Sequence, residues 1–379
     1  MTEQLYDPAL CGTGSESDPF HSGDGTAGIQ KGLDALSERG GRLNLTCGRY
    51  DLTETVVLDT SSLCLSGDVW SCNTDPNGVF EPKHGTKLRL MRTDIPALEV
   101  GKHTSPVSGA IVRDLGFQGN IPGMDTRKIV DFSAPEKSAG LCLASVRTDQ
   151  CEFSKLSCCG LANGVAVTGN AEVDACSFEK INADGCANGV WFAPRASFYA
   201  RFRFCILADT PYYGFYAATT KSMHNLEIFD THFVRNGGCF VDGDGRTPAA
   251  VLFDGVSRCA VAHCLFDDPG TFWYYNDDAT QNTERQPSHR PLVALWVIGN
   301  ENRIKDNTFL HSSSDSIRIE GKGNVLLANI VDGNVRISGE GNIVSGLVFT
   351  KPDARLILEG AARDTTTVIG VPEARILRI

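Results

Sequence analysis

The chain has 379 residues and a formal net charge of −11, from 35 basic and 46 acidic side chains. This balance argues against nucleic acid or an anionic membrane as a partner, but it leaves a neutral sugar open. No window approaches the roughly 18 apolar residues of a membrane span. Residues 1–9 lack the basic segment and apolar run of a secretory leader. We therefore expect a cytoplasmic protein, or a secreted one if a leader is removed from the natural chain.

The 14 cysteines are expected to be free thiols, because no export signal is present. Cys176, Cys205, Cys239 and Cys264 lie in apolar segments, where cysteine acts as a small buried hydrophobe. The pair Cys158-Cys159 lacks metal-ligand spacing, and no Cys-x-x-Cys motif occurs. We expect neither a metal nor an organic cofactor.

Residues 1–42 are predicted to form an N-terminal segment that ends in a capping α-helix. Thr26 is the expected N-cap, and Gly40-Gly41 ends the helix. Its apolar face consists of Ile29, Leu33 and Leu36. Such a helix would cover the open end of the unit that follows, which otherwise exposes apolar surface and unpaired strand groups.

Four tripeptides return at a nearly constant interval. They are Asn163-Gly164-Val165, Asn188-Gly189-Val190, Tyr213-Gly214-Phe215 and Gly237-Gly238-Cys239, with central glycines 25, 25 and 24 residues apart. A second series of phenylalanines runs beside them: Phe153, Phe178, Phe204, Phe233, Phe266 and Phe309. Two series in step indicate a repeated structural unit.

A period in the twenties, with Asn and Gly at the corners, is typical of a parallel β-helix. In Gly164–Thr168 the valines alternate with Ala166 and Thr168, as a strand requires. Leucine-rich repeats would need recurring leucines and a helical half-repeat, and a β-sandwich would give irregularly spaced hairpins. We predict an all-β chain in which residues 43–379 form one single-stranded right-handed parallel β-helix.

Several segments resemble known β-helix proteins. Asp24-Gly25-Thr26 and Gly48-Arg49-Tyr50 resemble the opening of the pectate-lyase-like superfamily. Residues 50–67, 112–117 and 299–302 are similar, more specifically, to inulin fructotransferases, which form difructose anhydrides. Over roughly residues 45–350, the resemblance implies a homotrimer that cleaves a fructan by intramolecular fructosyl transfer, with the active site near the subunit interface.

The chain departs from that family at the catalytic positions. The resemblance implies an acidic residue immediately before one Gly-Val strand and a second acid near the start of the next strand of the same turn. This sequence has Tyr213 in the first position and Ser222 to His224 near the second. The family's catalytic acids therefore cannot be transferred to this chain.

Loop insertions are expected at 118–139, 242–250 and 273–290, where the repeat interval lengthens. The last two follow the glycine-series strand in successive turns, so we expect them to emerge side by side. The loop 273–290 combines aromatic, acidic and guanidinium side chains, as a sugar-processing cleft does. A solvated loop held by ion pairs explains the same composition.

An aromatic stripe is predicted on the outer face of the same strands. If Val190 and Phe192 point inward, Trp191 points outward, and the same alternation exposes Tyr216 and Phe240 in a stripe leading to Trp273. Exposed apolar stripes indicate a contact, here either a subunit interface or a sugar-stacking surface.

Glycoside chemistry needs an acid that protonates the leaving oxygen and a carboxylate that attacks or activates the nucleophile. The candidate catalytic residues are Asp242, Asp277, Asp278 and Glu284, with Asp244, Asp267 and Asp268 nearby. The candidate substrate-binding residues are Trp191, Tyr216, Phe240, Trp273, Tyr274, Arg285 and His289.

The sequence thus predicts a homotrimeric enzyme that cleaves or transfers a glycosyl unit, with fructosyl as one candidate, of an oligosaccharide, a polysaccharide or a small glycoside. Three alternatives stay open: a polysaccharide lyase, a non-catalytic trimeric glycan-binding β-helix, and an intracellular enzyme acting on another metabolite. Polygalacturonase-type hydrolysis ranks low because the Gly-His-Gly element of that family is missing.

Overall fold

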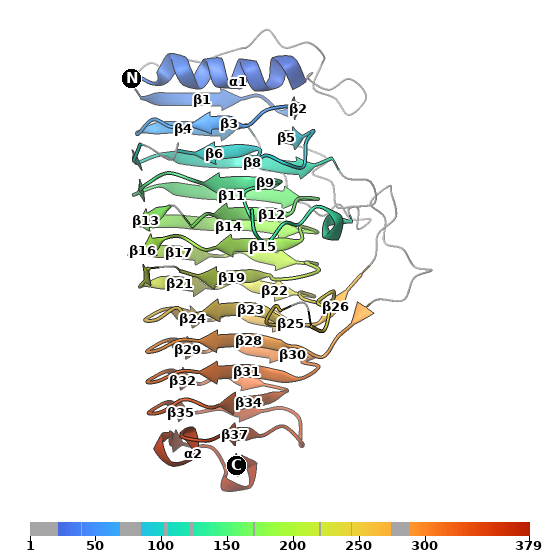
Figure 1. The fold of residues 1–379 in the computed structure, drawn as a ribbon, viewed down its shortest axis with the longest axis vertical. Helices are drawn as coiled ribbons and strands as arrows, with labels where there is room; N and C mark the ends of the chain where they lie inside the picture. Colours follow the sequence, from blue (N-terminus) through green and yellow to red (C-terminus); the bar gives the residue numbers. More distant parts are fainter. Residues whose placement is uncertain are drawn as a thin grey trace.

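The computed structural model describes residues 22–38, 40–68, 85–101, 105–120, 125–169, 171–219, 221–243, 245–273 and 288–379. Within these ranges the chain coils into a right-handed parallel β-helix, with α1 (Ser22–Leu36) at one end and the C-terminus at the other (Figure 1). The predicted fold class is confirmed.

Each turn of the solenoid crosses three main lines of strands, two of which belong to one 20-stranded sheet of the described chain. The first line comprises β1 (Gly41–Leu45), β4 (Leu63–Gly67), β8 (Ile111–Gly119), β11 (Glu152–Cys159), β14 (Cys176–Asp184), β17 (Ala200–Arg203), β21 (Leu226–Phe229), β24 (Ala260–Ala262), β29 (Arg303–Lys305), β32 (Val325–Leu327), β35 (Ile343–Ser345) and β38 (Thr367–Ile369). The second line contains β2 (Gly48–Leu52), β5 (Thr86–Leu90), the C-terminal halves of β8, β11 and β14, then β18 (Ile206–Ala208), β22 (His232–Val234), β25 (Leu265–Asp267), β30 (Thr308–Leu310), β33 (Ile330–Val331) and β36 (Val348–Phe349).

The third line is a 12-stranded parallel sheet, which carries the glycine series. It contains β3 (Val56–Leu58), β6 (Leu98–Val100), β9 (Ala139–Leu143), β12 (Asn163–Val167), β15 (Asn188–Phe192), β19 (Phe215–Ala218), β23 (Ala249–Asp254), β28 (Val293–Ile298), β31 (Asp315–Glu320), β34 (Asn334–Ile337), β37 (Leu356–Leu358) and β39 (Ile376–Arg378). A narrow sheet of β7 (Val107–Ser108), β10 (Thr148–Asp149), β13 (Glu172–Asp174), β16 (Ala196–Ser197) and β20 (Ser222–Met223) closes part of the coil.

Five short elements complete the described chain. The 3₁₀ helix η2 (Thr126–Lys128) lies in the insertion 118–139, and α2 (Ala362–Thr365) and η3 (Glu373–Arg375) lie near the C-terminus. β26 (Thr271–Phe272) and β27 (Ser288–His289) form an antiparallel pair at the base of the 273–290 loop.

The glycine series stacks as predicted over its first three members. A side chain on Gly164 would come within 2.6 Å of the carbonyl oxygen of Gly189, so the close approach of the strands requires glycine there. The prediction that Gly237-Gly238-Cys239 is the fourth member of this series is wrong. Gly214 N–H donates instead to the Ala250 carbonyl at 2.8 Å, because the next strand of this sheet, β23, begins only at Ala249.

The predicted single series of phenylalanines consists of two separate stacks of rings. Phe153, Phe178 and Phe202 stack along the first line, with ring centroids 4.9 and 4.2 Å apart. Phe233, Phe266 and Phe309 stack along the second line, at 4.8 and 4.4 Å. Phe204 is not in either: it occupies a corner with φ 56° and is 47% exposed. Phe204 comes two residues after the inward-pointing Phe202, so spacing alone selected the wrong phenylalanine of the two.

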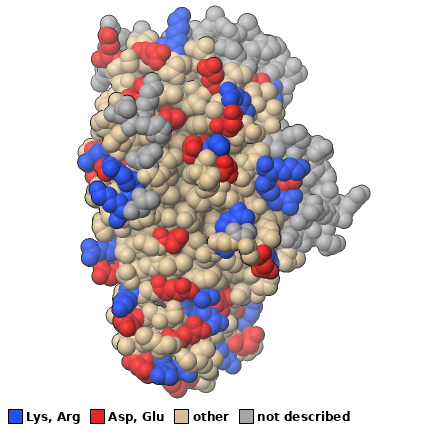
Figure 2. Space-filling view, in the orientation of Figure 1, with Lys and Arg blue, Asp and Glu red and all other residues tan. Residues whose placement is uncertain are grey.

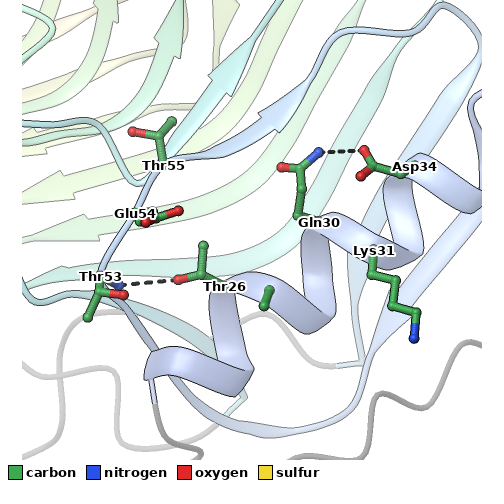
Figure 3. A pocket seen from close by; sticks show the side chains of 8 residues that line it. Thr26, Gln30, Lys31, Asp34, Thr53, Glu54 and Thr55 are labelled. Carbon is green, nitrogen blue, oxygen red and sulfur yellow. Dashed lines mark hydrogen bonds between the residues drawn. The ribbon is translucent and has the colours of Figure 1, made fainter.

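Helix α1 covers the first turn, as predicted, with Ile29 and Leu33 buried. The Gln30 carboxamide pairs with the open edge of β3, since it accepts from Val57 N–H at 2.8 Å and donates to the Val57 carbonyl at 3.1 Å. The prediction that Thr26 is the N-cap of this helix is wrong. Thr26 lies inside the helix, where its hydroxyl accepts from the Thr53 N–H at 3.2 Å (Figure 3).

Buried thiols fill core positions at the corners. Burial raises the pKa of Cys205 and Cys264 to about 12, so both are neutral hydrophobes at ordinary pH, as predicted. Cys239 is half-buried in a turn rather than in a strand. In the described ranges, no three His, Cys, Asp or Glu side chains come together as metal ligands, and no helix is long and apolar enough to span a membrane.

Candidate functional site

An aromatic cluster covers the outer face of the 12-stranded sheet. Trp191 of β15 and Tyr216 of β19 are register partners, and their ring centroids lie 4.1 Å apart. Both rings are half-buried, with Val190 and Phe192 pointing into the core. The predicted outward orientation of Trp191 and Tyr216 therefore agrees with the structure.

Phe240 differs from the prediction. It lies in the loop before β23 and packs edge-on against Tyr213, with ring centroids 4.9 Å apart. Only 3% of it is exposed. The segment around Phe240 folds back over the sheet instead of continuing it, so this ring is packed against Tyr213 rather than exposed in a stripe.

Three further rings belong to the cluster and were not predicted. Phe132, from the insertion 118–139, lies 5.7 Å from Trp191 and 5.1 Å from Tyr212. Arg246 stacks over the Phe132 ring at 4.1 Å. Among the described residues, the rings of this aromatic cluster that contact one another are Phe132, Trp191, Tyr212, Tyr213, Tyr216 and Phe240, and Trp296 packs at the edge of the same apolar group. The adjacent tyrosines Tyr212 and Tyr213 could have indicated an aromatic cluster from the sequence. Phe132 could not, because it lies in an insertion that does not follow the repeat.

The two predicted loops meet beside this cluster. Arg290, at the base of the 273–290 loop, forms an ion pair with Asp242 of the 242–250 loop and also donates to the Phe240 carbonyl. The Asp242 carboxylate is 98% exposed, whereas Arg290 is largely covered. The described ends of the two loops are therefore in contact, while residues 274–287 lie outside the described residues.

A hollow of about 410 Å³ opens next to the cluster. Asp125 and Arg127 of the insertion line one side, and Tyr212 and Phe240 line the other. Burial acts to raise the pKa of Asp125, but Arg127 at 2.6 Å and Lys128 at 3.4 Å outweigh it and hold that pKa below its usual range. Asp125 is therefore a carboxylate at neutral pH.

The remaining predicted residues divide into two groups. His289 is exposed, and its Nδ1 lies 2.9 Å from the Thr271 hydroxyl, while Trp273 is half-buried at the end of β26. Asp277, Asp278, Glu284, Tyr274, Arg285 and Asp244 lie outside the described residues.

A buried acid pair lies at the corner before this sheet. Asp209 is fully buried and receives two hydrogen bonds from Arg235, each of 2.6 Å. Asp184 lies one turn earlier, and burial together with the charge of Asp209 raises its pKa well above the usual range. Asp267 binds His311 at 2.9 Å and Asp268 binds Thr271 at 2.7 Å. Burial and, to a smaller extent, the charge of Asp268 raise the pKa of Asp209, although Arg235 acts to lower it.

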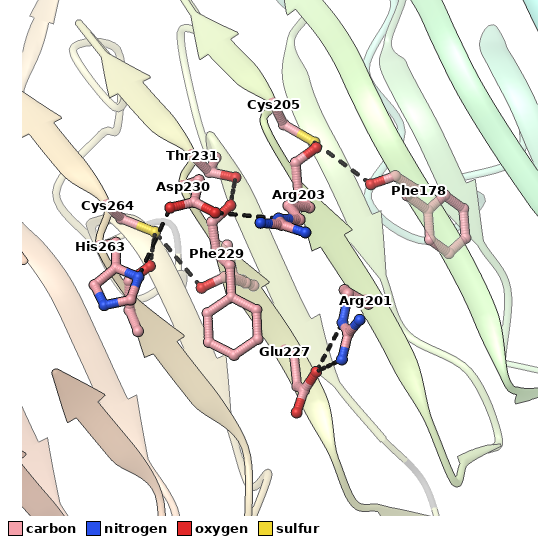
Figure 4. Close-up of polar contacts among 12 residues, drawn as sticks. Phe178, Arg201, Arg203, Cys205, Glu227, Phe229, Asp230, Thr231, His263 and Cys264 are labelled. Carbon is pink, nitrogen blue, oxygen red and sulfur yellow. Dashed lines mark hydrogen bonds and ion pairs between the residues drawn. The ribbon is translucent and has the colours of Figure 1, made fainter.

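The outer face of the 20-stranded sheet is different in character, because ion pairs dominate it. Arg201 bonds Glu227 at 2.8 Å and Arg203 bonds Asp230 at 3.2 Å, with His263 beyond them (Figure 4). Acidic and basic side chains also intermix over the C-terminal turns in Figure 2. Compensated charges of this kind suit solvent contact rather than capture of a polyanion.

The comparisons agree with this geometry at the level of fold. No family model and no curated protein matches the chain. The solved structure of DFA-IIIase from Arthrobacter chlorophenolicus A6 in complex with GF2 superposes with a TM-score of 0.64 at 14% identity, covering 94% of this chain and 92% of that one. This chain shares the β-helix fold of DFA-IIIase.

Two further structures extend the likeness. DFA-IIIase without its lid, in complex with GF2, gives a TM-score of 0.66 at 15% identity over 100% of this chain and 99% of that one. ORF18 of Geobacillus virus E2 gives 0.58 at 15% identity, over 95% of this chain and 60% of that one. The predicted resemblance to the inulin fructotransferases is thus confirmed as a resemblance of fold.

Proposed function

We propose that this protein cleaves or transfers a glycosyl unit of an oligosaccharide on the face that carries the aromatic cluster. The observation that supports it best is the ion pair between Arg290 and Asp242, which holds a solvent-facing carboxylate beside stacked aromatic rings. Sugar rings stack on aromatic faces, and carboxylates perform glycoside chemistry. DFA-IIIase, which shares the fold, binds GF2 and DFA-III in its solved structures.

Two roles follow for the described acids. Asp242 is exposed and paired with a guanidinium, so it suits the carboxylate that attacks or activates. Asp125 lines the hollow as a second carboxylate with a lowered pKa. The reaction also needs a proton donor, and Asp277, Asp278 and Glu284 of the adjoining loop remain our candidates. The same proposal includes a homotrimer, with the exposed edge of the cluster near the subunit contact.

Turnover of GF2, DFA-III and inulin, followed by anion-exchange chromatography of the products, tests the proposal. We expect Asp242→Asn to lower kcat by about 10²-fold or more, the range typical of a lost acid or base. Asp364→Asn is the matched control, because Asp364 is also exposed and paired with an arginine but lies in α2. Equal rates for the parent and Asp242→Asn would remove Asp242 from the mechanism.

A non-catalytic glycan binder is the second candidate. It is favoured by Tyr213, which stands where the resembling family has an acid, and by the fold shared with a viral protein. Such a binder would retain sugar affinity in Asp242→Asn and show no turnover in either protein. Calorimetric titration of GF2 alongside the turnover assay separates the two candidates.

A further inference from the structure

Asp254 adds a further carboxylate to the border of the aromatic cluster. It is the last residue of β23, and the Tyr216 hydroxyl donates to its Oδ2 at 3.4 Å. The Tyr216 ring is itself stacked on Trp191, with centroids 4.1 Å apart. Asp254 is therefore in direct contact with the rings against which the proposed function places a sugar.

Strand alternation turns this carboxylate to the outer face of the sheet. Val251 and Phe253 of β23 are buried in the core, so Leu252 and Asp254 point outward. Leu252 is the register partner of Tyr216 and is only 2% exposed, whereas Asp254 is exposed. The exposed aromatic surface thus ends at Tyr216 in this direction, and Asp254 stands at its border.

Tyr216 is the donor in this contact. Burial, and then the charge of Asp254, raise the pKa of the Tyr216 phenol to about 12, so the hydroxyl keeps its hydrogen at neutral pH. A carboxylate offers about four lone-pair positions, and the phenol uses one of them in a long contact. Asp254 can therefore accept further, shorter hydrogen bonds from a ligand.

Asp254 differs from Asp242 in having no cationic partner. Asp242 is paired with Arg290. In the part of the chain that the structure describes, the only hydrogen bond to the Asp254 carboxylate comes from Tyr216, and no lysine or arginine pairs with it. Its negative charge is uncompensated, so hydroxyl groups of a ligand that donate to it would form charge-assisted hydrogen bonds.

From this arrangement we infer that Asp254 is a sugar-binding residue that selects uncharged sugars, with Tyr216 positioning its carboxylate. This inference rests on the part of the proposed function that places the sugar against the aromatic cluster. A sugar ring packed against Tyr216 brings its hydroxyl groups to Asp254, because the phenol oxygen at the end of the ring contacts that carboxylate. Neighbouring hydroxyl groups can donate to its two oxygens. A uronate in the same place would add a second negative charge beside an uncompensated one.

Titration calorimetry with GF2 and with a galacturonate trisaccharide tests the selectivity. We expect the parent protein to bind the galacturonate about tenfold more weakly than GF2, or more weakly still, because of the like charges. Asp254→Asn should lower the affinity for GF2 about tenfold, since it removes a charged acceptor. Asp254→Arg should raise the affinity for the galacturonate by about tenfold.

Glu359→Gln is the matched control. Glu359 directly follows β37 of the same sheet, but its carboxylate is paired with Arg336. Four strands separate it from β23 in the order of this sheet, so it lies far from the aromatic cluster. We expect its affinities for both sugars to equal those of the parent protein.

A double-mutant cycle tests the role of Tyr216. Tyr216→Phe keeps the ring and removes the hydroxyl, so we expect the affinity for GF2 to fall about threefold. In the Asp254→Asn background the same change should have a much smaller effect, because the hydroxyl acts through the carboxylate. Equal losses in the two backgrounds would refute the positioning role of Tyr216.

The selectivity and the proposed function can fail separately. Unchanged GF2 affinity in Asp254→Asn, or equal binding of the two sugars by the parent protein, refutes the role of Asp254 and leaves the turnover test of Asp242 unaffected. The expected affinity changes without turnover refute an enzyme and retain Asp254 as the selective residue of a glycan binder. A parent protein that binds neither sugar refutes both.

Discussion

Arg290 and Asp242 are 48 residues apart in the chain, yet their side chains form an ion pair across the mouths of two adjacent loops. The arginine also donates to the Phe240 carbonyl, so one side chain links the Asp242 carboxylate to the backbone of an aromatic residue. This contact places acidic chemistry beside the aromatic cluster, and the experiments below follow from it and from the buried charges nearby.

Arg290→Ala should raise KM for the sugar substrate but should hardly change the stability of the fold. Asp242 is almost fully exposed, so losing its partner leaves no buried charge and should hardly change the unfolding midpoint. The loop position, however, depends on the pair, and we expect KM for GF2 to rise at least tenfold. Steady-state kinetics and thermal unfolding of the same preparation measure both. A large drop in midpoint with unchanged KM would show that Arg290 serves stability alone.

Trp191→Ala should weaken sugar binding by about tenfold, which corresponds to about 1.4 kcal/mol. The Trp191 ring stacks against Tyr216 and is only half-buried, so its loss removes part of the exposed aromatic surface. Trp296→Ala is the matched control, because Trp296 lies on the same sheet but is covered by Arg318 at 4.2 Å. Titration calorimetry with GF2 measures the difference. Equal losses in both variants would argue for a general effect on the sheet.

Arg235→Ala should destabilise the fold by about 3–5 kcal/mol, because it leaves the buried Asp209 carboxylate without its bidentate partner. Arg258→Ala breaks an exposed pair with Glu301 at 2.7 Å, and we expect no measurable change there. Urea unfolding of both variants checks the contrast. Similar midpoints for the two would mean that water reaches Asp209.

Asp184→Asn should make stability less dependent on pH. The pKa of Asp184 is raised in the folded protein, so the folded state holds this proton more tightly than the unfolded chain. The resulting stability is complete below the unfolded pKa, roughly 3.9, and is lost as pH rises through the folded pKa. Asparagine imitates the neutral acid without titrating.

We therefore expect Asp184→Asn to equal the parent protein near pH 4 and to exceed its unfolding free energy at pH 8. Urea titrations at several pH values measure this crossover, and Asp364→Asn, at an exposed site, should follow the parent throughout. A variant that is less stable than the parent at pH 8 would show that the Asp184 carboxylate is ionised and contributes to stability.

The repeat could be predicted over β12, β15 and β19 because the strands there follow one another at a constant interval. The prediction failed at Gly237-Gly238-Cys239, which has the composition of the next strand but lies in a loop. A strand in a solenoid is defined by the neighbour to which it bonds, and the partner of Phe215 is Val251. Local composition carries no information about that partner.

In the candidate site, too, residues of regular strands could be predicted and residues of loops could not. Trp191 and Tyr216 were predictable because they alternate with core residues of regular strands. Phe132 and the burial of Phe240 were not, since both depend on how long loops fold back over the sheet. The buried Asp184 and Asp209 escaped notice because burial of a corner depends on what packs over it.

The regular spacing of glycine, valine and phenylalanine was enough to establish a parallel β-helix, because stacked turns must repeat whatever one turn buries. It could not establish which charged and aromatic side chains meet outside the solenoid. Loops have no period, so the contact of Arg290 with Asp242 and the link from Asp268 through Thr271 to His289 exist only once distant turns are packed in register.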